Sequence, residues 1–205
     1  MRTIGALLYD KFEVLDLYGP LEMFGSLPNE FRIITIAQAQ GPIASAQGPA
    51  TIAEHDFASA PKLDMLLVPG GVGTVAELNN PVLLDFLASR SATAQQVLSV
   101  CSGSALLAKA GLLDGKRATS NKMFFDLARN QSSAADWIEE ARWVVDGKFA
   151  TSSGVSAGTD MALAVIEQLL GREAADQVAT FTEYQRHEDP DSDPFSAFLN
   201  KGQLL

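Results

Sequence analysis

The sequence predicts a doubly wound α/β fold, in which a mostly parallel sheet carries helices on both faces in a flavodoxin-like sandwich. Two observations lead to this class. Short apolar runs at 64–68 and 97–100 are typical of strands buried on both faces. Helical patterns lie between such runs, and strands that alternate with helices form parallel sheets. We also expect a small accessory β-hairpin.

The first third of the chain begins with an apolar run at 4–9, which predicts the first core strand. A helix should follow with Pro20 in its first turn, because proline there leaves no N–H unpaired. Gly25 would end that helix. Residues 31–37 read as the second strand, and Gly-Pro pairs around 43–52 indicate a small hairpin or an edge extension.

The remaining elements follow from hydrophobic periodicity and from the glycines that bound it. The strands at 64–68 and 97–100 flank an amphipathic helix, and a further helix runs from Ser102 to a stop at Gly111. An Asp-Gly turn within 137–152 predicts a β-hairpin. The amphipathic helix covers residues 81–92, and the other predicted helices cover 124–128, 155–170 and 173–185.

Length and composition limit the function classes. A chain of 205 residues predicts one domain, placed at 1–187, followed by an acidic, flexible tail at 188–205. The net charge of -10 argues against nucleic acid and anionic membranes as partners. No apolar run approaches the ~20 residues that span a bilayer, and no signal peptide is expected. A single cysteine fits a reducing, cytoplasmic setting.

Cys101 lies where the strand at 97–100 turns into the next helix, among small residues. This placement resembles a nucleophile elbow, in which the side chain projects from a sharp strand-to-helix turn. The helix N-terminus behind it should lower the thiol pKa. The alternative is that a lone cysteine at a strand end is an inert small hydrophobic residue.

Two further strand ends carry candidate site residues. Asp16 follows the first strand in apolar surroundings, although an acidic residue in a first helical turn is often only a dipole complement. Gly70 and Gly71 follow the third long strand; they could present N–H groups to an oxyanion or form a plain tight turn. Because ligands bind beyond the carboxyl ends of parallel strands, we expect these residues to meet near Cys101.

Four stretches together resemble the ThiJ/PfpI superfamily, within the class I glutamine-amidotransferase-like fold and closest to its isocyanide hydratase branch. They are V-L-D-L-Y-G-P-L-E-M-F, D-M-L-L-V-P-G-G, S-V-C-S-G-S-A-L-L-A-K-A-G-L-L-D-G-K-R-A-T and T-S-S-G-V-S-A-G-T-D-M-A-L. The resemblance implies that Cys101 is the nucleophile and Asp16 its acidic partner. It also implies that Gly71 and Ser102 supply oxyanion N–H groups, with Gly70 beside them.

The chain departs from the superfamily pattern at two site positions. Ser102 stands where the protease and glyoxalase branches have a histidine, which disfavours a Cys-His dyad. Asn121 stands where the hydratase and regulator branches have a histidine, and an amide cannot shuttle a proton near neutral pH. We expect Asn121 to contact substrate without carrying protons.

The favoured hypothesis is therefore a cysteine-dependent hydratase that converts a small isocyanide and water to an N-formamide. The alternatives are a redox- or electrophile-sensing stress protein that uses the same thiolate, and an α-oxoaldehyde hydratase or deglycase. The resemblance implies a homodimer. No metal and no organic cofactor is expected, because no histidine–cysteine cluster has ligand spacing.

Overall fold

The computed structural model describes residues 1–202, which form a seven-stranded central sheet in the order β10-β11-β7-β6-β1-β2-β5. Within these residues every pairing in this sheet is parallel except that of β10 with β11. The predicted doubly wound α/β class is confirmed. The strands are β1 (Arg2–Leu7), β2 (Phe31–Ala37), β5 (His55–Asp56), β6 (Met65–Val68), β7 (Gln96–Val100), β10 (Trp143–Asp146) and β11 (Phe149–Ser152).

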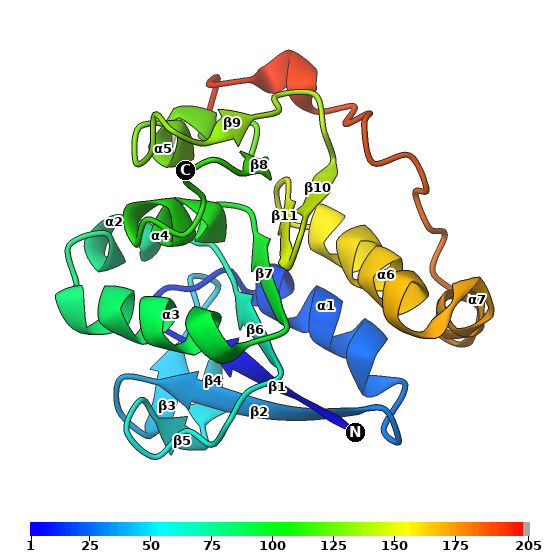
Figure 1. Ribbon diagram of the computed structural model, residues 1–205, viewed down its shortest axis with the longest axis horizontal. Coiled ribbons are helices and arrows are strands. Elements are labelled where there is room, and N and C mark those ends of the chain that lie inside the picture. Colours follow the sequence, from blue (N-terminus) through cyan, green and yellow to red (C-terminus); the bar gives the residue numbers. More distant parts are fainter. Residues whose placement is uncertain (203–205) are drawn as a thin grey trace.

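Helices cover both faces of the sheet, with α1 and α6 on one side and α3 and α4 on the other (Figure 1). The helix α7 packs against α6, and the short α2 lies beside α4. The apolar strands β6, β7 and β11 are buried along their whole length between these layers. The helices are α1 (Val14–Gly25), α2 (Thr74–Glu77), α3 (Pro81–Thr93), α4 (Gly103–Lys109), α5 (Phe125–Arg129), α6 (Ala157–Leu170), α7 (Arg172–Phe181) and the 3₁₀ turn η1 (Ser196–Phe198).

Two small sheets lie outside the central one. Strands β3 (Gly41–Ala44) and β4 (Ala50–Ala53) form the accessory antiparallel hairpin that the sequence predicts. Strands β8 (Arg117–Ala118) and β9 (Asp136–Trp137) pair in parallel. The hairpin predicted over 137–152 is therefore too long: only β10 and β11 form it, and they extend the central sheet.

Helix α1 begins earlier than a proline in its first turn predicts. It starts at Val14, so Pro20 lies in its interior rather than in its first turn. Burial of Leu17, Leu21 and Phe24 on one side of α1 favours the longer helix, because tertiary packing outweighs the local cost of proline. Asp16 lies in the first turn, as the sequence predicts, and its side chain is buried inside the protein.

The C-terminal segment packs against the body, where a flexible acidic tail is the expectation from sequence. The side chain of Asp193 is fully buried, and its backbone N–H donates to Glu140 O at 2.8 Å. The segment crosses from α7 to the region of α5 and β9 (Figure 1). Residues 203–205 of the predicted tail lie outside the described residues.

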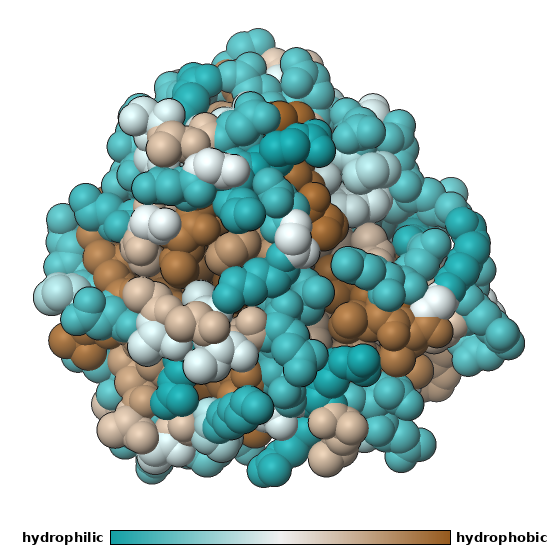
Figure 2. Space-filling model, in the orientation of Figure 1, coloured by the Kyte–Doolittle hydropathy of each residue, from teal (hydrophilic) through white to brown (hydrophobic). Residues whose placement is uncertain are grey.

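The visible surface is mainly hydrophilic, with hydrophobic patches between the polar side chains (Figure 2). Within residues 1–202, each helix is too short or too polar to cross a bilayer.

Helices α1 and α6 approach closely because each carries a glycine at the contact. A Cβ on Gly19 would lie 2.7 Å from Thr159 Oγ1, and one on Gly158 would lie 2.7 Å from a methyl group of Val100. Side chains at these positions would push the helices apart or displace β7. Gly25, at the end of α1, has room for a Cβ, which would lie 3.5 Å from Ile33.

Replacing Gly158 by valine should lower the free energy of unfolding by about 1–3 kcal/mol, because the added atoms overpack a contact without space. Urea denaturation followed by circular dichroism measures this change. Gly25→Ala is the matched control and should be neutral or stabilising by up to about 1 kcal/mol. Equal effects of the two substitutions would contradict the close contact between α6 and β7.

Candidate functional site

The candidate site residues lie at the carboxyl ends of neighbouring parallel strands. Val68 at the end of β6 pairs with Ser99 of β7, and Val100 pairs with Ser152 of β11. The segments that leave these strands therefore emerge side by side at one edge of the sheet. As the sequence predicts, this edge brings Cys101 together with Asp16, Gly70, Gly71, Ser102 and Asn121.

Cys101 occupies the tight turn between β7 and α4 in a left-handed conformation, with a φ of 57°. A left-handed φ is uncommon for residues other than glycine. Hydrogen bonds hold both sides of its backbone. The Cys101 N–H lies 3.2 Å from both Ser152 O and Ser153 O. Its carbonyl accepts from the hydroxyls of Ser104 and Ser120, each at 3.1 Å. The direction of the thiol is thus set by β11, α4 and the segment after β8.

Asp16 is fully buried in the first turn of α1. Its Oδ2 accepts the Gly70 N–H at 2.9 Å, whereas Oδ1 has no N–H or O–H partner within residues 1–202. Burial raises the pKa of Asp16 well above its usual value of 3.8, and the charge of Glu13 raises it further. The Gly70 N–H and the neighbouring Cys101 thiol lower the same pKa, with smaller effect than burial. Asp16 is therefore a carboxyl group able to hold a proton closer to neutral pH.

Gly70 allows Asp16 and the start of α4 to meet. A Cβ on Gly70 would lie 2.6 Å from both the N and Oγ atoms of Ser102 and 2.9 Å from Asp16 Oδ2. Any side chain would displace these groups. The glycine is required here because the backbone itself fills the space between the carboxyl and the turn.

A chain of buried hydroxyl groups connects the Gly71 N–H to the carbonyl of Pro69, at the start of the same loop. Tyr9 Oη donates to Pro69 O at 2.7 Å and lies 3.0 Å from Thr74 Oγ1. Thr74 Oγ1 lies 2.9 Å from Ser102 Oγ, which accepts the Gly71 N–H at 3.1 Å. Since each hydroxyl has one proton, Thr74 donates to Tyr9, and the Ser102 hydroxyl has Thr74 Oγ1 at 2.9 Å and Gly71 O at 3.4 Å as acceptors. Gly71 thus has its N–H engaged within the protein, and oxyanion binding by Gly71 stays a prediction that requires this bond to break.

Asn121 has a fixed amide orientation. Its Oδ1 accepts the Phe124 N–H at 3.0 Å, so Nδ2 is the end directed at Cys101. Gly154 makes this possible, because a Cβ there would lie 2.3 Å from Asn121 Nδ2. Nδ2 is therefore the donor that Asn121 can offer to the sulfur, and this donor lowers the pKa of Cys101.

The lowered thiol pKa expected from the helix N-terminus is wrong for this structure. Burial raises the pKa of Cys101 well above its usual value of 9.0, and the charge of Asp16 is the second cause. The N–H of Ser102, the Asn121 amide and the N–H of Val155 act in the opposite direction. Only 8% of the Cys101 surface is exposed, and loss of water outweighs these three donors.

Neither histidine of the chain contributes to this edge of the sheet. His55 lies on the edge strand β5, and His187 Nε2 contacts Ser192 O in the C-terminal segment. Among residues 1–202, no cluster of His, Cys, Asp and Glu has the arrangement of a metal site.

Sequence reasoning missed several residues that shape the site. Tyr9 and Thr74 gave no signal, because the hydroxyl contacts that make them relevant exist only in three dimensions. Gly154 and Val155 follow the end of β11, so the rule that found Gly70 could also have found them. Val155 has a positive φ of 32°, which no sequence pattern reveals.

Comparisons with known proteins agree with this architecture. Residues 2–168 match the model of the DJ-1/PfpI family. An isonitrile hydratase of Pseudomonas putida is 36% identical over 88% of this chain and 78% of its own length. The crystal structure of a ThiJ/PfpI family protein from Pseudomonas syringae has a TM-score of 0.82 at 36% identity, covering 91% of this chain and 76% of the other.

The likeness extends to a protein of another function class. An HTH-type transcriptional regulator of Pseudomonas aeruginosa is 29% identical over 90% of this chain, which spans 51% of the regulator. Family and fold are nevertheless shown by the match over residues 2–168 together with the arrangement of the sheet. The chain belongs to the DJ-1/PfpI family.

Proposed function

We propose that this protein is a cysteine-dependent hydratase that adds water to a small isocyanide, or isonitrile, to give an N-formamide. The observation that carries the proposal is the buried pair of Cys101 and Asp16, with donors from Ser102, Asn121 and Val155 directed at the sulfur. The likeness to an isonitrile hydratase over most of both chains supports the same reaction. The left-handed turn at Cys101 supports its role as the nucleophile.

In the first step the Cys101 sulfur attacks the terminal carbon of R–N≡C while its proton passes to the Asp16 carboxylate. The carbon then takes that proton from Asp16, giving the thioimidate R–N=CH–S–Cys101. A carboxyl group with a raised pKa suits both transfers, because proton exchange is fastest when the pKa lies near the working pH. The N–H of Ser102 and the Asn121 amide stabilise negative charge on sulfur as it develops.

In the second step a water molecule adds to the thioimidate carbon and gives its proton to nitrogen. Collapse of the adduct breaks the C–S bond, releases R–NH–CHO and returns the proton to the Cys101–Asp16 pair. The covalent intermediate divides one difficult addition into two easier ones. The unpartnered Asp16 Oδ1 provides a place for the transferred proton during both steps.

Formamide production from an alkyl or aryl isocyanide, followed by chromatography, tests this reaction. Cys101→Ala should abolish it, and Asp16→Asn should lower kcat/KM by about 100- to 10,000-fold because the amide cannot exchange the proton. Ser89→Ala, on the outer helix α3, is the control and should retain full activity. Turnover that is absent in the unmodified protein, or unaffected by Cys101→Ala, would refute the hydratase.

The pH dependence of thiol alkylation tests the coupling of Cys101 to Asp16. Only the thiolate reacts, so the rate of iodoacetamide labelling, measured by mass spectrometry, should still be rising at pH 9. Because the charge of Asp16 raises the thiol pKa, Asp16→Asn should move the labelling midpoint to lower pH. A midpoint that moves upward would instead mean that Asp16 faces the sulfur as a neutral hydrogen-bond donor.

A redox or electrophile sensor is less well supported. Such a sensor needs an exposed thiolate at neutral pH, whereas Cys101 is buried and its pKa is raised. An α-oxoaldehyde hydratase or deglycase is also less well supported, because the family branches to which that activity is ascribed carry a histidine beside the nucleophile, where this chain has Ser102.

We also propose that the protein is a homodimer. Large apolar side chains lie exposed on α1 and on the accessory hairpin, namely Leu15, Tyr18 and Ile52. The Tyr18 hydroxyl lies 2.8 Å from Thr51 Oγ1, which joins the two elements in one surface. Apolar side chains gathered on one surface favour contact with another protein.

Light scattering after size-exclusion chromatography should give twice the 21.9 kDa mass of one chain. Tyr18→Asp should shift the population toward monomer, since it places a charge in the apolar contact. Val82→Asp, an exposed apolar residue on α3, is the control and should leave the mass unchanged. A mass of a single chain at micromolar concentration would rule out the dimer.

A further inference from the structure

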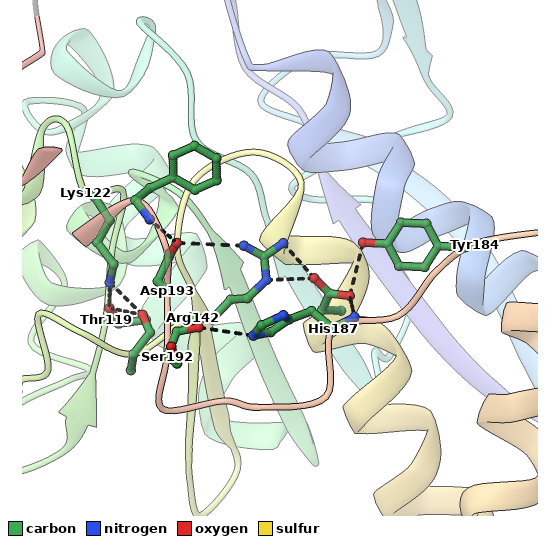
Figure 3. Close-up of polar contacts among 10 residues, drawn as sticks. Thr119, Lys122, Arg142, Tyr184, His187, Ser192 and Asp193 are labelled. Carbon is green, nitrogen blue, oxygen red and sulfur yellow. Dashed lines mark hydrogen bonds and ion pairs between the residues drawn. The ribbon is translucent and has the colours of Figure 1, made fainter. Parts of the chain in front are cut away.

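The C-terminal segment is attached to the body by a buried group of charges (Figure 3). Nε and Nη2 of Arg142 lie 2.8 and 2.7 Å from Asp160 Oδ2, and Nη1 lies 3.8 Å from Asp193 Oδ1. These three side chains are at most 8% exposed. Removing one partner of such a group leaves an uncompensated buried charge, which is costly. Asp193, which belongs to the C-terminal segment, is therefore held firmly.

Further hydrogen bonds fasten the first half of this segment. Tyr184 Oη and the His187 N–H both donate to Asp160 Oδ1, at 3.0 and 2.9 Å (Figure 3). The Arg142 N–H donates to Pro190 O at 2.7 Å. We call residues 184–202 the C-terminal strap, since they run from the end of α7 across this charged group.

The far end of the strap is bonded to the residues that directly follow Asn121. The N–H of Asn200 donates to Lys122 O at 2.9 Å, and that of Gly202 donates to Met123 O at 3.0 Å. The Asn200 side chain accepts the N–H of Asp126 at 2.8 Å. These bonds fix the backbone on the C-terminal side of Asn121.

Lys122 fixes the same turn from the inside. Its Nζ donates to Thr119 Oγ1 at 2.8 Å and to Ala141 O at 2.6 Å. Burial lowers the pKa of Lys122 to about 8, and the charge of Asp193 is the largest effect in the opposite direction. Asp193 thus pairs with Arg142, and its charge also acts on the buried ammonium of Lys122.

Asn121 lies between β8 and α5, outside the described strands and helices, where the Ser120 hydroxyl and the Phe124 N–H hold it locally. We propose that the C-terminal strap positions the Asn121 amide against the Cys101 sulfur, and that Asp193 and Asn200 are the positioning residues. The strap lies beyond residues 2–168, the part that matches the family model. The proposal is independent of the hydration reaction, because it concerns the state of the thiol itself.

Asn200→Gly tests the strap with little risk to the fold. Asn200 has a φ of 56°, which glycine adopts freely, so the substitution removes the acceptor for Asp126 without strain. Asp193→Asn is the second variant and removes the buried charge while keeping the shape. Lys201→Ala is the control, because the Lys201 side chain donates to Ala197 O within the strap itself.

The measurement is the pH midpoint of Cys101 labelling by iodoacetamide, which does not depend on how easily the reagent enters. Both variants should raise the pH midpoint of labelling, because the Asn121 donor no longer stabilises the thiolate. At a pH below the midpoint, labelling should be about twofold to tenfold slower than in the unmodified protein. Lys201→Ala should leave the midpoint unchanged. Circular dichroism identifies a variant that has lost the fold. If Asp193→Asn unfolds the protein, the test rests on Asn200→Gly, which removes no buried charge.

A double-mutant cycle separates positioning from general loosening. In an Asn121→Ala background the strap substitutions should have no further effect on the midpoint, because the group they position is gone. An equal shift in both backgrounds, or no shift from Asn200→Gly in the unmodified protein, would overturn the proposal. Failure of the hydratase assay would leave these results unaffected, so the two hypotheses fail separately.

Discussion

The candidate site depends on how the backbone of Cys101 is satisfied in its left-handed turn. Its N–H reaches the two serine carbonyls at the end of β11, and its carbonyl accepts hydroxyls from α4 and from the segment after β8. Buried backbone polar groups need partners, so this one residue ties three separate parts of the chain together. Ser120, which supplies one of these hydroxyls, directly precedes Asn121, and the same bonding therefore also places the amide at the sulfur.

Burial governs the electrostatics around that turn. Two acidic groups, the Asp16 carboxyl and the Cys101 thiol, lie in a region with little water, and burial raises the pKa of both. Two neighbouring negative charges are unfavourable there, so the pair tends to retain a proton between its members. The donors around sulfur reduce the cost of moving that proton to Asp16. This balance suits a step in which sulfur becomes a nucleophile only when an electrophile arrives.

The sequence predicted the layers of the fold well and some boundaries poorly. Short, mainly apolar runs such as β6 and β7 are typical of central strands, and their alternation with helices predicted the parallel sheet. Pro20 gave the wrong start for α1, because packing of the helix outweighed the local preference of proline. Trp137 was placed in the hairpin, although it pairs with the distant β8. Local signals cannot report such distant pairing.

By itself, the sequence determined the fold class and the gathering of Asp16, Gly70, Gly71 and Cys101, because carboxyl ends of parallel strands meet at one edge. Tertiary structure alone decided the direction of the thiol pKa, since desolvation depends on neighbours from every layer. It also decided the chain of hydroxyls that engages the Gly71 N–H, and the docking of the acidic C-terminal segment through Asp193. Composition predicts solvent exposure for such a segment, and most of its side chains are exposed, but the buried partner Arg142 holds Asp193 inside the protein.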